Sequence, residues 1–137
     1  MGYRSEVAYM IRFKDKEQRD SFIALQLIKQ DPDINEALKH LKQLGDDKLF
    51  FHVPDWKWYD GYGEVKAHTT LYEEAIELYE DSAYLFYRLG EDLEDIEQHD
   101  GGDVDDLWDY LSVHKYINLD IDTNSVKPIL TEEGELV

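Results

Sequence analysis

The sequence predicts a single α+β domain in which a largely antiparallel sheet carries about four helices. With 137 residues, of which 42% are apolar and 13% aromatic, the chain is long enough to enclose one hydrophobic core. Segments with an apolar period of two occur beside segments whose apolar residues recur every three or four positions. The two kinds of segment do not alternate strictly, as they would in a parallel α/β fold, and this favours an antiparallel sheet.

The first strand and the first helix follow from the opening of the chain. In SEVAYMIRF, the residues Val7, Tyr9 and Ile11 alternate onto one face, which predicts a strand. Asp15 is a suitable N-cap, and Gln18 three residues later completes a capping box. A helix is therefore expected to run from there to about Lys29.

The second helix has the clearest signals in the sequence. Asp31 is placed to cap it, and Pro32 suits the first helical position because its missing N–H would be unpaired there in any case. Gly45 is expected to end this helix. One apolar stripe runs along it: Ile34, Ala37, Leu38, Leu41 and Leu44.

The middle of the chain predicts two strands and a third helix. KLFFHV has the composition of a buried strand, and WKWY is expected to form a short strand after the break at Pro54 and Asp55. Thr70 and Glu73 resemble a capping box, which predicts a helix from there to about Asp81.

The last third predicts two more strands and a short fourth helix. AYLFYRL and YINLDI are the expected strands. After a cap at Asp103, Val104, Leu107, Trp108 and Leu111 have the i, i+3, i+4, i+7 spacing of a helix. This places Trp108 in the core, so Trp108→Ala is expected to cost about 3–5 kcal/mol. Residues 1–130 would form the domain and residues 131–137 a flexible tail.

Charge is distributed very unevenly along the chain. Residues 1–50 contain nine acidic and nine basic residues, so the whole net charge of −18 comes from residues 51–137. The run from Gly90 to Leu111 holds ten carboxylates and no lysine or arginine. A surface of this kind repels nucleic acids and anionic membranes and attracts basic protein surfaces.

The acidic run is predicted to be folded rather than disordered. Leu93 and Ile96, together with the apolar residues of the expected fourth helix, have spacings that can reach a core. Disordered acidic chains lack such residues. Gly101 and Gly102 would form a mobile tip.

Two expected helices carry acidic outer faces without interleaved lysines. Like charges three or four positions apart on a helix repel one another and destabilise the fold, which favours a use for them in binding a partner. Duplex DNA also presents rows of charge, about one per 1.7 Å of axis. The sequence therefore predicts a non-enzymatic inhibitor that mimics nucleic acid and binds a basic nucleic-acid-binding host protein. The carboxylates assigned to this contact are Glu73, Glu77, Glu80, Asp81, Glu91, Asp92, Glu94, Asp95, Asp103, Asp105, Asp106 and Asp109.

An aromatic segment supports a second hypothesis. In DWKWYDGY, Trp56 and Trp58 share a face if the chain is extended, and Tyr59 points the other way. Exposed aromatic residues of this kind form the centres of protein interfaces. In this alternative the chain is a protein-interaction module, Trp56 and Trp58 are part of the contact, and the acidity serves solubility. Ordinary core packing of the two tryptophans is the competing interpretation.

No catalytic residue, cofactor or metal site is predicted. The chain has no cysteine, no G-x-S-x-G and no phosphate-binding glycine loop, and its acidic run does not match a calcium-binding loop. His52, His68, His99 and His114 lie far apart in the sequence, without the spacing of a zinc motif. Without a secretory signal or an apolar span, the expected location is the cytoplasm, with no direct contact to nucleic acid or membrane.

Three segments resemble a set of small, mostly uncharacterised proteins of phages and mobile elements. They are MGYRSEVAYMIRF, DWKWYDGYGEV and RLGEDLEDIE. This resemblance implies a phage origin and assigns no residue role. By charge alone, the composition is also similar to that of phage-encoded DNA mimics, which inhibit restriction, CRISPR or other DNA-binding host proteins. That likeness implies a location in the host cytoplasm.

Overall fold

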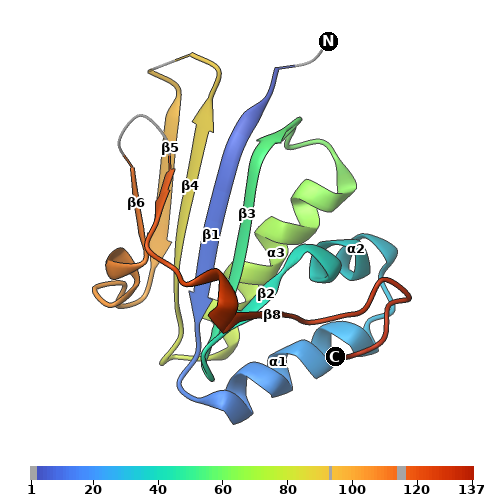
Figure 1. The fold of residues 1–137 in the computed structure, drawn as a ribbon. Helices are drawn as coiled ribbons and strands as arrows, with labels where there is room; N and C mark the ends of the chain where they lie inside the picture. The colour runs from blue at the N-terminus through green and yellow to red at the C-terminus, as the bar shows by residue number, and fades with distance from the viewer. Residues whose placement is uncertain (1–2, 93, 114–116) are drawn as a thin grey trace.

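A six-stranded antiparallel sheet forms the centre of the computed structural model, which describes residues 3–92, 94–113 and 117–137 (Figure 1). The strand order is β5-β4-β1-β3-β2-β8. The strands span β1 Ser5–Arg12, β2 Lys42–Leu44, β3 Lys48–Trp56, β4 Ala83–Gly90, β5 Ile96–Gly101 and β8 Val126–Pro128. The predicted α+β class with an antiparallel sheet is confirmed.

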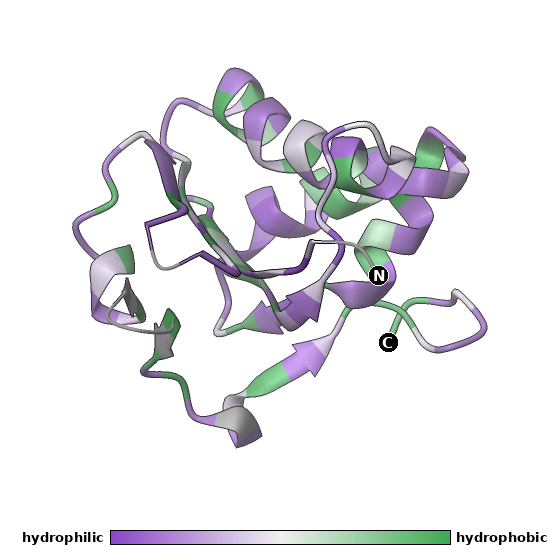
Figure 2. Cartoon of the chain, turned by 90° about the horizontal axis from the view of Figure 1, so that it is seen from above, coloured by the Kyte–Doolittle hydropathy of each residue, from purple (hydrophilic) through white to green (hydrophobic). Residues whose placement is uncertain are grey.

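Three α-helices cover one face of this sheet. Figure 2, a view from above, shows the helices on one side of the sheet and the chain that follows β5 on the other. The helices are α1 Lys16–Ile28, α2 Pro32–His40 and α3 Gly63–Leu78. The expectation of about four helices was one too high for the described residues. In place of the fourth helix there is a single 3₁₀ turn, η1 Leu107–Asp109.

The core lies on both faces of the sheet. Val7, Tyr9 and Ile11 of β1 point toward the helices, as their alternation predicted, and all three are buried. Ala8 and Met10 point the other way and are equally buried, beneath η1 and the small sheet of β6 Leu111–Val113 and β7 Ile117–Leu119. β1 is therefore a central strand covered by protein on both sides, which its alternating pattern did not indicate.

The prediction that Trp108 lies in the core was wrong. Leu107 and Leu111 are buried as expected, but Trp108 is 52% exposed. A 3₁₀ turn has three residues per turn, so Val104 and Leu107 share a face and Trp108 points about a third of a turn away from them. The spacing of apolar residues that predicted an α-helix is therefore also compatible with a 3₁₀ turn.

The second helix ends four residues earlier than predicted. Its cap is as expected, because the Asp31 carboxylate accepts hydrogen bonds from the N–H groups of Asp33 and Ile34. The chain becomes extended at Leu41, and the next three residues pair with β3 as β2. Gly45, with φ of +61°, belongs to the β2–β3 turn and does not end the helix.

The third helix begins seven residues earlier than the predicted capping box. It starts at Gly63, so Thr70 and Glu73 lie inside it rather than at its end. It also stops at Leu78, which leaves Glu80 and Asp81 in the turn before β4. The separate strand expected for WKWY is absent from the described chain, because β3 continues through Pro54 to Trp56.

The edge strand β5 was not predicted. It pairs only with β4, and its first residue, Ile96, is 53% exposed rather than packed in the core. Gly102, just after the strand, adopts φ of +74° against the backbone of Ser82 and Ala83, where a side chain would clash. Leu93 and His114 lie outside the described residues, as does Tyr116 at the start of the last predicted strand.

The chain ends in a small hairpin. Leu130 and Leu136 form an isolated antiparallel bridge, and the N–H of Val137 donates to the carbonyl of Ile129. Among the described residues, no helix is both long and apolar enough to cross a bilayer.

Candidate functional site

Most of the predicted partner-binding carboxylates belong to segments at the two ends of β4 and β5, the strands at one edge of the sheet (Figure 1). One group comprises Glu91, Asp92, Glu94 and Asp95, in and beside the β4–β5 turn. The other lies at the opposite end of β5, where the α3–β4 turn meets the segment from Asp103 to Asp109. Glu73 and Glu77 are exposed on α3. The structure thus brings most of these residues to one side of the molecule.

Arg12 joins two acidic segments that are distant in the sequence. Its guanidinium donates to the carbonyl oxygens of Asp81 and Asp103, each at 3.0 Å, and forms an ion pair with the Asp106 carboxylate at 3.0 Å. The arginine side chain is only 19% exposed, so its positive charge lies beneath the acidic surface. The sequence did not assign Arg12 this position, because it lies about 70 to 95 residues from its partners.

A second arginine orders the acidic turn at the other end. Arg88 forms ion pairs with Asp95 at 2.8 Å and with Glu97 at 2.9 Å, and the Tyr3 hydroxyl also donates to Asp95. The hydrogen bonds from Arg88 and Tyr3 lower the pKa of Asp95. Burial acts to raise the pKa of Glu97, but hydrogen bonds from Arg88 and His99 outweigh burial and lower it. Both carboxylates are therefore held in the charged form.

Most of the predicted carboxylates form no ion pair within the described part of the chain. Of the twelve, only Asp95 and Asp106 form an ion pair with another described residue. In the first 50 residues, by contrast, acidic side chains are commonly paired, as Asp20 is with Lys16 and Glu36 with Lys39. The unpaired carboxylates leave a strong negative potential along this edge of the molecule.

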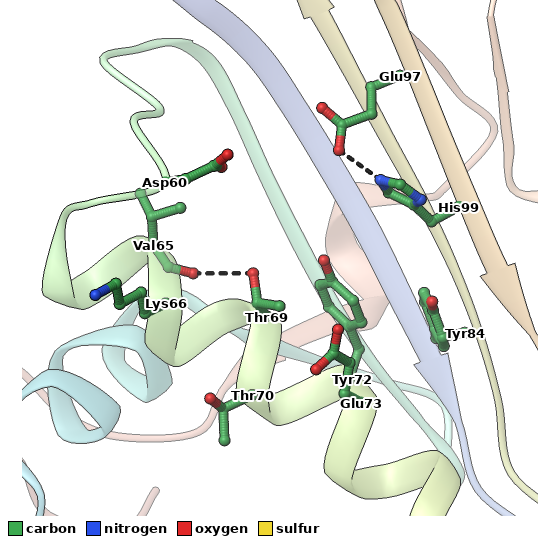
Figure 3. A pocket seen from close by; sticks show the side chains of 10 residues that line it. All are labelled: Asp60, Val65, Lys66, Thr69, Thr70, Tyr72, Glu73, Tyr84, Glu97 and His99. Carbon is green, nitrogen blue, oxygen red and sulfur yellow. Dashed lines mark hydrogen bonds and ion pairs between the residues drawn. The ribbon is translucent and has the colours of Figure 1, made fainter.

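A cleft of about 510 Å³ opens between α3 and the β4–β5 edge (Figure 3). Tyr72 and Tyr84 stack against each other at its base, with ring centroids 4.5 Å apart. Three carboxylates line it, and His99 contacts one of them, Glu97. The lining residues are Asp60, Val65, Lys66, Thr69, Thr70, Tyr72, Glu73, Tyr84, Glu97 and His99.

The lining of the cleft is acidic, with three carboxylates and one lysine, Lys66. Burial raises the pKa of Tyr72 to about 12; a hydrogen bond with Thr69 opposes this shift, and the charges of Glu73 and Glu97 add to it. Tyr72 therefore stays neutral at physiological pH. Neutral aromatic faces beside carboxylates can hold a lysine or arginine side chain through ion pairing and cation–π contact.

The aromatic segment lies elsewhere, beneath α2 and α3. Trp58 is 8% exposed and belongs to the core, and Trp56 is partly buried against it. Core packing is therefore the correct interpretation for Trp58. The two rings lie 6.1 Å apart, and both flank the fully buried His68. Neither tryptophan joins the acidic edge.

Beside these rings the structure assembles a cluster that sequence reasoning missed. His40 at the end of α2 and Glu64 and His68 on α3 place their ligand atoms within 4.8 Å of one another. Part of this cluster was visible in the sequence, since Glu64 and His68 are four positions apart and share a helix face. His40 joins them only through the packing of α2 on α3.

Comparison with known proteins adds no relative to this description: no family model, curated protein or solved structure matches the chain. The resemblance to phage proteins is therefore neither supported nor contradicted.

Proposed function

We propose that the chain is a non-enzymatic inhibitor that binds the basic nucleic-acid-binding surface of a host protein by mimicking a nucleic acid. The observation that carries the proposal is the junction made by Arg12, which unites the α3–β4 turn and the segment from Asp103 to Asp109 into one acidic surface. Arg12 holds the two segments together and pairs with Asp106, while the other carboxylates of the two segments form no ion pair with a described residue.

The acidic edge has a surplus of carboxylates that are available to a partner. Ten carboxylates lie in the run from Gly90 to Leu111, two of them on β5 itself. Arg12 and Arg88 pair with three of the ten, namely Asp95, Glu97 and Asp106. The other seven form no ion pair with a described residue and support an electrostatic role for this edge.

The cleft between α3 and β5 adds a place for a specific contact. Its stacked tyrosines and its carboxylates Asp60 and Glu73 fit a single arginine or lysine side chain that projects from the partner. Such a contact would fix the orientation of the partner in the complex, which long-range electrostatic attraction alone does not define.

The proposal is tested by competition. A basic partner is first captured from a host lysate and identified, and nucleic acid then competes with the protein for that partner. Excess duplex DNA or RNA should displace the protein, because both would occupy the same groove. An amide variant changes Glu73, Glu77, Glu80, Asp105 and Asp109, none of which forms an ion pair with a described residue. This amide variant should not bind the partner. Its free energy of unfolding should be unchanged or higher, because repulsion between the carboxylates is relieved. A single change such as Glu77→Gln should mainly slow association.

A matched control removes the same charge elsewhere. Amides at Glu17, Asp46, Glu132, Glu133 and Glu135, which are all exposed, give an equal net charge without touching the β4–β5 edge. This variant should retain most of the affinity. Equal loss in both variants would show that only total charge matters, and a ternary complex of protein, partner and DNA would refute mimicry.

The alternative of an aromatic interaction module loses its main residue, because Trp58 is in the core. That function would depend on Trp56, Tyr59 and the exposed Tyr62, whose ring packs on Tyr59. Substitution of Tyr62 by alanine should then weaken partner binding without altering the melting temperature.

A further inference from the structure

The cluster of His40, Glu64 and His68 has no part in the proposed acidic interface. His68 is fully buried on α3, and its neighbours are the rings of Phe51 and Trp58. An imidazole in such apolar surroundings normally satisfies both ring nitrogens with hydrogen bonds. Here only one of them is satisfied.

Two buried polar atoms in the cluster lack hydrogen-bond partners. They are Nε2 of His68 and Oε2 of Glu64, which face each other across 3.6 Å. Nδ1 of His40 approaches the same carboxylate oxygen at 3.3 Å. Leaving buried polar groups unpaired destabilises the fold, so a group that satisfies both atoms would stabilise the site.

Two of the three separations between ligand atoms fit ligands around one ion, and the third, between the two histidines, is no more than 4.8 Å. Ligand atoms at about 2.0–2.2 Å from a tetrahedral zinc ion lie about 3.3–3.6 Å from one another. The two distances to Glu64 Oε2 fall in this range. Direct hydrogen bonds between the same groups would be about 2.7–2.9 Å long.

A second residue orients His68 from behind. The hydroxyl of Tyr9 lies 2.5 Å from Nδ1 of His68 and fixes the orientation of the imidazole. With Nδ1 engaged by Tyr9, Nε2 is the ring nitrogen that faces Glu64. This arrangement matches the outer partner that metal-ligating histidines usually have.

The geometry points to a binding site for one divalent transition-metal ion of the zinc class, held by His40, Glu64 and His68. Imidazole and carboxylate ligands suit zinc and its neighbours better than calcium or magnesium. Three protein ligands leave one coordination position for water or an added ligand. His40 is the exposed member of the set.

The inference is tested by titrating the full chain with Co²⁺ after EDTA has removed any bound metal. The buffer contains excess Mg²⁺, which occupies the acidic surface, and physiological salt, which screens its charge. Paramagnetic Co²⁺ should quench tryptophan fluorescence at one ion per chain, because Trp56 lies 5.3 Å from His40 and Trp58 lies 5.5 Å from His68. Zn²⁺ should reverse the quenching and raise the melting temperature.

Variants separate this site from diffuse binding. His40→Ala and Glu64→Gln alter residues that are not fully buried, and each should raise the dissociation constant at least tenfold. His99→Ala is the matched control, because His99 is also exposed and paired with a glutamate but has no second imidazole beside it among the described residues. It should bind Co²⁺ as the unaltered chain does.

Two results would overturn the inference. One is the absence of saturable quenching and of any Zn²⁺-dependent rise in melting temperature, which would make the cluster an ordinary ion pair. The other is an equal loss of affinity in His40→Ala and His99→Ala, which would mean that ions bind the acidic surface as a whole.

Discussion

Replacing Arg12 by methionine should destabilise the protein markedly, because this arginine joins the acidic segments. Methionine keeps an apolar stem and removes the three polar contacts, with the carbonyls of Asp81 and Asp103 and with the Asp106 carboxylate. A hydrogen bond contributes about 0.5–1.5 kcal/mol, and more when a charge takes part. Because the freed oxygens lie near the surface and regain water, we expect a total loss of about 2–3 kcal/mol.

The assay is thermal and urea unfolding, with Arg4→Met as the control. A loss of 2–3 kcal/mol corresponds to a fall in melting temperature of about 6–12 °C for a chain of this size. High salt should recover part of the loss, since it screens the carboxylates that Arg12 no longer neutralises. Arg4 lies 3.9 Å from Asp55 at an exposed position, so its removal should cost no more than about 0.5 kcal/mol. Equal melting of the two variants would refute the role assigned to Arg12.

Two further predictions concern packing and pH. Trp108→Ala should cost less than about 1 kcal/mol because the ring is half exposed, whereas Leu107→Ala, at a fully buried position, should cost about 2–5 kcal/mol in urea unfolding. The reverse order would contradict the placement of η1. Arg88→Met should lower stability at neutral pH and flatten its decline in acid, because folding lowers the pKa values of the two carboxylates that Arg88 binds. In the unaltered chain their contribution is present above the ordinary carboxyl pKa near 4 and is lost as the pH falls through the lower folded values. Melting curves of both proteins from pH 7 to pH 3 would measure this difference, and parallel curves would contradict it.

Local signals in the sequence determined several elements directly. The alternation around Tyr9 predicted β1, and the pair of Asp31 and Pro32 predicted where α2 begins. These features depend on backbone geometry within a few residues, which a cap or a period of two specifies by itself. The acidity of the second half was equally plain from composition.

The residues at which helices and strands begin and end depended on the tertiary structure. Leu41 and Leu44 fit the stripe of a longer helix, yet the chain forms β2 because β3 offers a strand to pair with. The spacing around Trp108 fits an α-helix as well as a 3₁₀ turn, and only packing against the outer face of the sheet decided between them. A periodic pattern shows which residues are apolar but not which competing structure buries them.

The candidate sites show the same division. The sequence located the carboxylates, but only the fold showed that Arg12 joins two groups of them and leaves most unpaired. Glu64 and His68 share a helix face by their spacing alone, while His40 reaches them through the packing of α2 on α3. Contacts between residues close in sequence follow from local geometry. Contacts across 24 or 70 positions exist only once hydrophobic burial has brought the helices and strands together, because no local interaction can hold such distant residues in place.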